Sequence, residues 1–106
     1  MLRIKRPKLK IKRPLPFVGK DKSFITIGGN EILGLTDLLI SLKNMIESDF
    51  RSHVNSKKNE FQEWIRDELG DRILARSIRW TTTRETTIEK IKDHIEKTYL
   101  ISRQGS

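Results

Sequence analysis

The chain has 106 residues and a mass of 12.5 kDa, enough for one small domain with its tails. It contains no cysteine, which excludes disulfide bonds, thiolate metal sites and thiol catalysis. Its 22 lysines and arginines outnumber 14 acids, and this net charge of +8 favours a polyanionic partner. No apolar run is long enough to span a bilayer or to form a secretory signal, so we expect an intracellular, cytoplasmic protein.

The positive charge is concentrated at the N-terminus. Residues 1–16 hold seven cations and no acid, whereas the other 90 residues hold 15 cations and all 14 acids. The seven cations are Arg3, Lys5, Arg6, Lys8, Lys10, Lys12 and Arg13. All three prolines fall in the same segment, which puts a boundary near Pro16. The sequence therefore predicts a basic extended tail over 1–16, a small helical domain with an N-terminal β element over 17–101, and a frayed C-terminus over 102–106.

The tail repeats with a period of seven residues, since Leu2–Lys8 is matched at most positions by Leu9–Leu15. The prolines exclude a coiled coil because each of them breaks helical hydrogen bonding. Leucine or isoleucine alternates with lysine or arginine, a pattern typical of an extended chain that follows the phosphates of a polyanion. Two alternatives are a disordered solubilising tail and an edge strand that docks on its own domain.

The β element is expected at the start of the domain. Residues 16–19 and 24–27 read as two short strands around the polar turn 20–23. Gly28, Gly29 and Asn30 then end the extended run.

An amphipathic helix is predicted over residues 35–46. Its apolar stripe consists of Leu35, Leu38, Leu39, Leu42, Met45 and Ile46. We expect Thr36, or the residue before it, to cap this helix. Ser48 is predicted to cap a short helical turn that carries Phe50, His53 and Val54, and residues 55–58 read as a connection.

Three further helices are predicted from caps and apolar faces. Asn59 with Gln62 resembles a capping box that opens a helix, and Gly70 suits the left-handed position that ends it. Asp71 is expected to cap a short helix that reaches Trp80, and Thr82 with Glu85 to cap the last one. The apolar positions of these helices are Phe61, Trp64, Ile65, Leu69, Ile73, Leu74, Ile78, Ile88, Ile91, Ile95 and Tyr99.

These elements predict a mainly α fold, a compact bundle of four to five helices with a small N-terminal β-hairpin and an extended basic tail. Phe50, Phe61, Trp64 and Tyr99 are expected in the core, whereas Trp80 could lie exposed at an interface. A chain of this size buries only about 60–65% of its unfolded surface, so we expect a homodimer.

The central part of the chain carries a recognisable set of motifs. They are His53-Val54-Asn55, Asn59-Glu60-Phe61, Trp64-Ile65-Arg66-Asp67, Gly70-Asp71 and Leu74-Ala75. This set resembles a family of small, mostly archaeal helical domains with the pattern H-V-N…N-D-F…W-I-R-D…G-D…L-A. Glu60 stands where aspartate is usual, and the match covers about residues 24–79. The resemblance implies an intracellular, archaeal helical domain and supplies no chemistry.

Few residues offer catalytic or metal-binding groups. His53 and His94 lie 41 residues apart without the spacing of a zinc site. Glu60, Glu63 and Asp67 share a helix face, but interleaved arginines make solvated ion pairs the simpler explanation. The phosphate-binding glycine motifs are absent, so we expect no enzyme activity, no cofactor and no metal.

The second basic group lies in the C-terminal half. Arg72, Arg76 and Arg79 are spaced to share a helix face, and Arg84 follows just after Trp80. The threonines at 81–83, 86 and 87 add hydroxyls at a helix start, which together with arginines suit phosphate binding. Two short helices joined by a tight turn also faintly resemble a helix-turn-helix. Alternatively, the arginines pair with Glu68 and neighbouring acids and the threonines only cap.

The sequence thus predicts a non-enzymatic nucleic-acid-binding protein that contacts the backbone phosphates of duplex DNA with little sequence preference. The 11 cations named above in the tail and near Trp80 are the expected contacts. DNA is favoured over RNA because no RNA-recognition signature is visible, and the location would then be the nucleoid. The alternatives are an adaptor whose tail docks on an acidic protein, and a ribosome- or RNA-associated protein.

Overall fold

The computed structural model describes residues 10–101, which form five helices and three short antiparallel strand pairs. The predicted mainly α class is confirmed. The helices are α1 (Leu35–Asn44), α2 (Glu47–His53), α3 (Glu60–Trp64), α4 (Arg72–Ile78) and α5 (Arg84–Thr98), with single helical turns η1 (Lys20–Lys22) and η2 (Ile65–Leu69). The strand pairs are β1 (Lys10–Ile11) with β6 (Leu100–Ile101), β2 (Phe24–Ile25) with β3 (Glu31–Ile32), and β4 (Val54–Asn55) with β5 (Lys58–Asn59).

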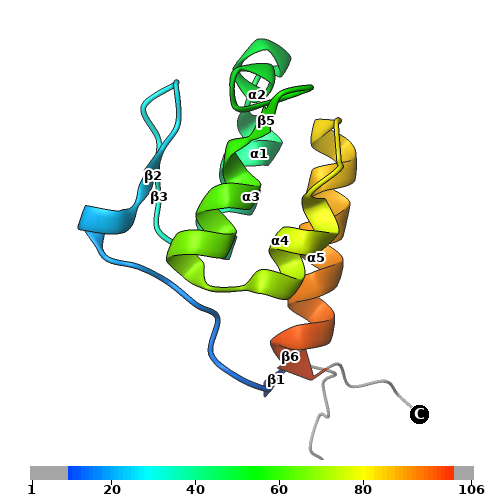
Figure 1. Cartoon of the computed structure of the whole chain (residues 1–106). Helices are drawn as coiled ribbons and strands as arrows, with labels where there is room; N and C mark the ends of the chain where they lie inside the picture. The colour runs from blue at the N-terminus through cyan, green and yellow to red at the C-terminus, as the bar shows by residue number, and fades with distance from the viewer. Residues whose placement is uncertain (1–9, 102–106) are drawn as a thin grey trace, which may run out of the picture.

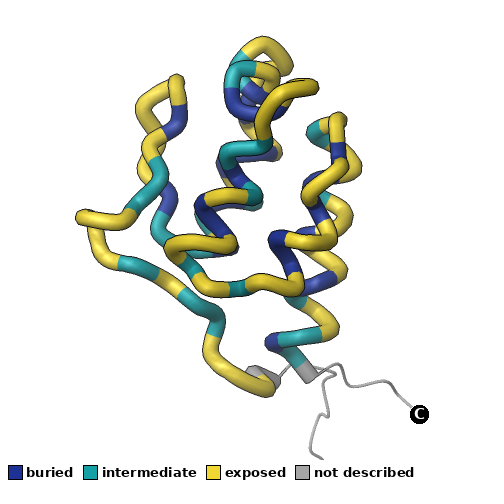
Figure 2. Tube along the Cα trace, in the orientation of Figure 1, coloured by how far each residue is buried: buried dark blue, intermediate teal, exposed yellow. Residues whose placement is uncertain are grey.

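Helix α5 packs against both α1 and α4, and α3 packs against α4 (Figure 1). The β2–β3 hairpin stands at one side of the bundle, and the segment after β1 crosses the base to reach it. Figure 2 shows that the buried positions lie where the helices face one another, while their outer turns are exposed. Within residues 10–101, none of the helices is long and apolar enough to cross a membrane.

The stripe predicted for α1 forms the centre of the core. Leu35, Leu38 and Leu42 are fully buried, and the aromatic side chains expected in the core are buried as well. Ile46 is 63% exposed because the backbone turns extended at Met45 and the helix has already ended.

The cap predicted for α1 at Thr36 or the residue before it was wrong. The N-cap is Gly34, which has no side chain to accept a hydrogen bond. The Asp37 carboxylate in the first turn accepts from the N–H of Leu33 at 3.0 Å, which ties the start of the helix to the residue before the cap.

The hairpin exists, but its strands pair differently from the prediction. Phe24–Ile25 pairs with Glu31–Ile32 rather than with residues 16–19, of which only Phe17 makes a bridge, to Gly34. The expected polar turn is instead the helical turn η1. Gly29 lies between β2 and β3 with a φ of +92°, a backbone conformation that glycine adopts readily in tight turns. It therefore allows the chain to reverse between these two strands, whereas residues 20–22 form a helical turn.

The local signals around α3 and α4 were predicted correctly. Asn59 caps α3 by accepting from the N–H of Gln62 at 3.0 Å, and Asp71 caps α4 by accepting from the N–H of Leu74 at 3.1 Å. Gly70 ends η2 with a φ of +75°. These predictions hold because a cap or a left-handed turn is decided by residues three or four positions apart.

Two other caps lie one or two residues from the predicted position. Helix α2 starts after Ile46, so Ser48 lies inside it. Helix α5 starts after Thr83, whose hydroxyl accepts from the N–H of Thr86, rather than after Thr82. The start of α5 is set by a local cap one residue later than predicted, whereas α2 starts without a side-chain cap.

The base of the predicted tail is part of the fold. Lys10 and Ile11 pair with Ile101 and Leu100, and the N–H of Lys12 donates to the carbonyl of Tyr99 at 2.7 Å. The edge-strand alternative therefore holds for this short stretch. Arg3, Lys5, Arg6 and Lys8, like the C-terminus predicted to fray, lie outside the described residues.

Arg84 closes the C-terminal end of α1. Its Nη1 lies 3.0, 3.2 and 3.0 Å from the carbonyl oxygens of Leu42, Lys43 and Met45. The last carbonyls of a helix have no partner within it, and a cation there also interacts favourably with the helix dipole. Arg84 therefore joins α1 to α5.

We expect Arg84→Ala to lower the free energy of unfolding by about 1–3 kcal/mol, because carbonyl groups at the end of α1 lose their donor. Urea unfolding followed by circular dichroism measures this loss. Arg76→Ala is the matched control, since Arg76 is exposed and is expected to change stability by less than about 0.5 kcal/mol. Equal unfolding midpoints for the two variants would contradict this role of Arg84.

Candidate nucleic-acid interface

Helix α4 and its C-cap residue Arg79 present three arginines on one exposed face, as their spacing predicts; we call them the α4 arginines. Arg72, Arg76 and Arg79 line a common hollow of about 260 Å³ together with Arg66. Within residues 10–101, none of the three α4 arginines makes a salt bridge, whereas Arg66 is held by both carboxylate oxygens of Asp67 at 2.7 and 3.0 Å. The alternative partner Glu68 pairs with Lys22 instead, at 3.7 Å. Helix α4 thus carries three cations that no acid in the described part of the chain neutralises.

Arg84 does not join this group, which corrects the predicted patch of four arginines. Its guanidinium faces the end of α1 and its Nη2 lies 3.4 Å from Glu85. The reason is topological, because α5 begins beside the end of α1. Arg84 therefore lies on a different helix from Arg72 and Arg76, although it follows Arg79 by only five positions in the sequence.

The α4 arginines are part of a longer line of positive charge. Arg13 and Arg72 line one hollow, the α4 arginines line the next, and Arg79 lines a third with Lys57 and Lys58. Neighbouring hollows share Arg72 and then Arg79, so the line is continuous. We call it the basic track and define it by six exposed residues: Arg13, Arg72, Arg76, Arg79, Lys57 and Lys58.

The elements that carry the basic track follow one another in Figure 1 from the segment after β1 at the base, along α4, to the β4–β5 turn at the top. Sequence reasoning missed Lys57 and Lys58, because residues 55–58 read only as a connection. The tight pairing of Val54 with Asn59 makes the connection a hairpin whose turn stands beside the end of α4.

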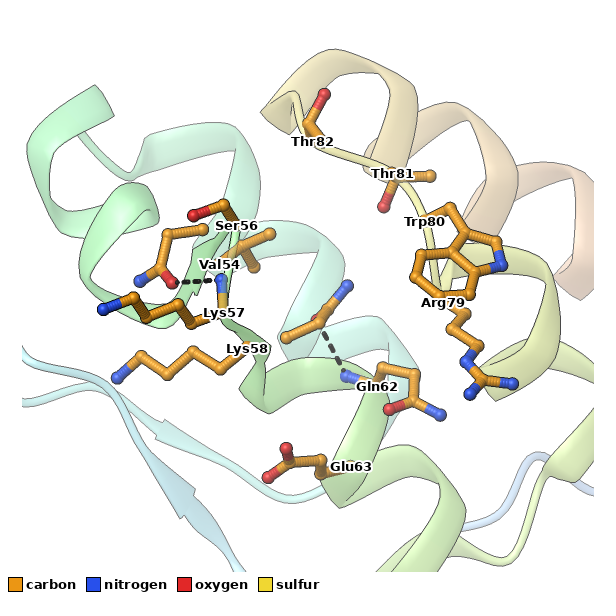
Figure 3. Close-up of a pocket in the computed structure, with 12 residues that line it drawn as sticks. Val54, Ser56, Lys57, Lys58, Gln62, Glu63, Arg79, Trp80, Thr81 and Thr82 are labelled. Carbon is orange, nitrogen blue, oxygen red and sulfur yellow. Dashed lines mark hydrogen bonds between the residues drawn. The ribbon is translucent and has the colours of Figure 1, made fainter.

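The upper end of the basic track is a groove of about 350 Å³ (Figure 3). The β4–β5 turn forms one side, Arg79 and Trp80 form the other, and Gln62 and Glu63 of α3 lie between them. Trp80 is 80% exposed, and the Arg79 guanidinium carbon lies 4.9 Å from the centre of its ring. Figure 3 shows both lysine side chains extending away from the indole, and Lys58 Nζ lies 3.1 Å from Glu60 Oε2.

Asp71 holds the lower end of α4 in place beside Arg13 and Arg72. Its Oδ2 accepts from the Tyr99 hydroxyl and lies 2.8 Å from His94 Nε2, while its Oδ1 caps α4. Burial acts to raise the pKa of this carboxyl, but the hydrogen bonds from Tyr99, Leu74 and His94 outweigh burial and hold the pKa below its usual value. Burial and the Asp71 carboxylate raise the pKa of Tyr99. The Asp71 carboxylate is therefore negatively charged, and hydrogen bonds within the chain already occupy both of its oxygens.

The acidic residues of α3 and η2 form a surface that adjoins the basic track, where Lys58 Nζ lies 3.1 Å from Glu60 Oε2. Glu60, Glu63, Asp67 and Glu68 line a hollow of about 390 Å³ with His53. His53 Nε2 accepts from the N–H of Ile27 at 3.1 Å, so Nδ1 carries the proton that it shares with Glu60 at 2.9 Å. Burial acts to raise the pKa of Glu60, but its contacts with His53 and Lys58 lower it overall. No group of three or more side chains suited to a metal ion exists within residues 10–101.

The motif residues behind the archaeal resemblance tie elements together. Asn59 donates to the carbonyl of Ile78 at 3.0 Å, and Trp64 Nε1 donates to the carbonyl of Lys22 at 2.8 Å. His53 and Asp71 join distant elements in the same way. No known protein family, curated protein or solved structure matches the chain. The resemblance to small archaeal domains stays a prediction.

We predict that Asp71→Asn weakens the acid dependence of stability. Because the pKa of Asp71 is lower in the folded chain than in the unfolded chain, its carboxylate stabilises the fold above the unfolded value of about 3.9. This contribution is lost as pH falls through the lower, folded value. Urea unfolding between about pH 2 and pH 7 measures it.

In this experiment the native chain should lose stability more steeply below about pH 4 than Asp71→Asn does. Tyr99→Phe should fall between the two, because it removes one donor and leaves the carboxylate. A native chain and an Asp71→Asn variant with parallel pH profiles would contradict the role assigned to these hydrogen bonds.

Proposed function

We propose that the chain is a non-enzymatic nucleic-acid-binding protein that contacts the backbone phosphates of duplex DNA with little sequence preference. The observation that carries the proposal is the exposed row of Arg72, Arg76 and Arg79, which makes no salt bridge in the part of the chain described. Neighbouring cations without acidic partners repel one another, and a bound polyanion offsets this repulsion. Release of counterions from DNA phosphates supplies the free energy of such binding.

The dimensions of α4 support this proposal. The seven steps from Arg72 to Arg79 advance about 10 Å along a helix. Duplex DNA carries one phosphate per 3.4 Å of axis on each strand, so the row spans about three intervals between successive phosphates. Because phosphates are the same at every base pair, contacts of this kind give affinity without sequence preference.

The N-terminal tail extends the same surface in this proposal. Arg13 lies beside Arg72 at the base of the molecule, so the residues before it start from the lower end of the basic track. Contacts from the tail would add Arg3, Lys5, Arg6 and Lys8 to the phosphates bound. A DNA-binding protein of this kind would reside in the cytoplasm, on the nucleoid.

The test compares the full chain with the variant Arg72→Gln/Arg76→Gln/Arg79→Gln by fluorescence anisotropy on one labelled duplex from 50 to 300 mM salt. Each phosphate contact contributes about one unit to the slope of log K against log salt. The triple variant should therefore bind more weakly and reduce the magnitude of the slope by about three. A second variant with Gln at Arg3, Lys5, Arg6 and Lys8 should reduce it by about four if the tail takes part.

The charge-matched control is Lys43→Gln/Lys90→Gln/Lys92→Gln, which removes three exposed cations that lie outside the basic track. Its slope should change by less than about one unit. Equal losses for the control and the α4 variant would show attraction by net charge alone. Failure of the native chain to bind at 50 mM salt would contradict the proposed function.

A further inference from the structure

Trp80 occupies a position that core packing does not explain. It is 80% exposed, whereas the only other tryptophan, Trp64, is buried with its Nε1 bonded to the Lys22 carbonyl. A tryptophan side chain left in water is a large apolar surface without a partner. It also lies at the upper end of the basic track, between Arg79 and the start of α5.

The surroundings of Trp80 fit a flat, polar-edged ligand. One guanidinium, that of Arg79, lies near the indole, and the rest of the ring borders a groove of about 350 Å³ (Figure 3). This volume is in the range of about 300–1,000 Å³ that small-ligand pockets occupy. The groove lining carries the hydrogen-bonding side chains of Ser56, Gln62, Glu63 and Thr82, whereas those of Asn55, Asn59 and Thr81 are bonded within the chain.

The charges of the lining suit a nucleotide rather than a neutral aromatic molecule. Lys57, Lys58 and Arg79 line the groove with one acid, Glu63. Lys58 Nζ lies 3.1 Å from Glu60 Oε2, so within residues 10–101 Lys57 and Arg79 are the two lining cations that make no salt bridge. The lysines extend outward, away from the indole, as Figure 3 shows. Phosphates therefore fit the rim, and a base fits the space beside the ring.

We propose that this groove binds an unpaired nucleotide next to a duplex, with its base stacked on Trp80 and its phosphates against Lys57 and Arg79. This inference rests on the proposed function, because DNA bound along the basic track places the end of one of its strands next to the groove. Aromatic stacking needs a base with a free face, which a nucleotide inside a duplex does not offer. The preferred target is then a duplex with a single-stranded extension.

The test uses three labelled DNA probes that share one duplex: a blunt end, an overhang of four thymidines, and the same overhang built from four abasic nucleotides. The two overhangs carry the same phosphates, so they differ only in bases that can stack. The full-length native chain should bind the thymidine overhang on the order of 10- to 100-fold more tightly than the abasic one. Stacking should also quench the fluorescence of Trp80, while buried Trp64 is unaffected.

Trp80→Ala should bring the two overhangs to within about twofold of each other, and Trp80→Phe should keep part of the preference. The matched control is Phe17→Ala, because Phe17 is 81% exposed and lies outside the groove, and it should keep the native preference. Circular dichroism of each variant checks that the fold is retained.

Tight binding of all three probes without preference for the thymidine overhang would overturn this inference and leave the proposed function standing. So would an equal loss on every probe for Trp80→Ala, since the indole would then contact paired DNA. Absence of binding to any probe at 50 mM salt would overturn the proposed function and this inference together.

Discussion

The position of α4 depends on the buried carboxylate of Asp71. One of its oxygens caps the helix, and the other accepts from Tyr99 while it contacts His94. His94 lies in the last two turns of α5, and Tyr99 directly follows this helix. Tyr99 in turn accepts the N–H of Lys12 through its carbonyl and lies under the Arg13 guanidinium at 5.5 Å. A single anion therefore joins the start of α4, the end of α5 and the base of the tail. Replacing it leaves buried donors without a partner, which is more costly than losing an exposed ion pair.

This arrangement separates the charges of the domain, although its sequence mixes them. Arg72, Arg76 and Arg79 turn outward on α4, whereas the acids of α3 and η2 gather in a different hollow beside His53. Glu63 lines both this hollow and the groove at Trp80, so it marks the border between the two surfaces. Opposite charges on adjoining surfaces orient a polyanion, because it is attracted by one surface and repelled by the other.

Sequence reasoning succeeds where a few neighbouring residues decide the structure. The caps at Asn59 and Asp71 and the left-handed Gly70 need only a polar side chain or a glycine at the correct spacing. It fails where a distant contact decides: Arg84 bonds to carbonyls about 40 residues away, so its place outside the α4 row has no local signal. The helical spacing of the α4 arginines was visible, but their continuation to Arg13 and to the lysines of the β4–β5 turn appears only once the chain is folded.

The most direct measurement of the central claim is an NMR titration of the full-length chain with a short duplex, which maps amide chemical-shift changes at low salt. The changes should concentrate on α4, on the segment from Lys10 to Arg13, and on the turn at Lys57 and Lys58, and they should disappear as salt rises. Changes centred on the hollow lined by Glu60 and Glu68, or spread evenly over the surface at every salt concentration, would contradict a basic track that binds phosphates.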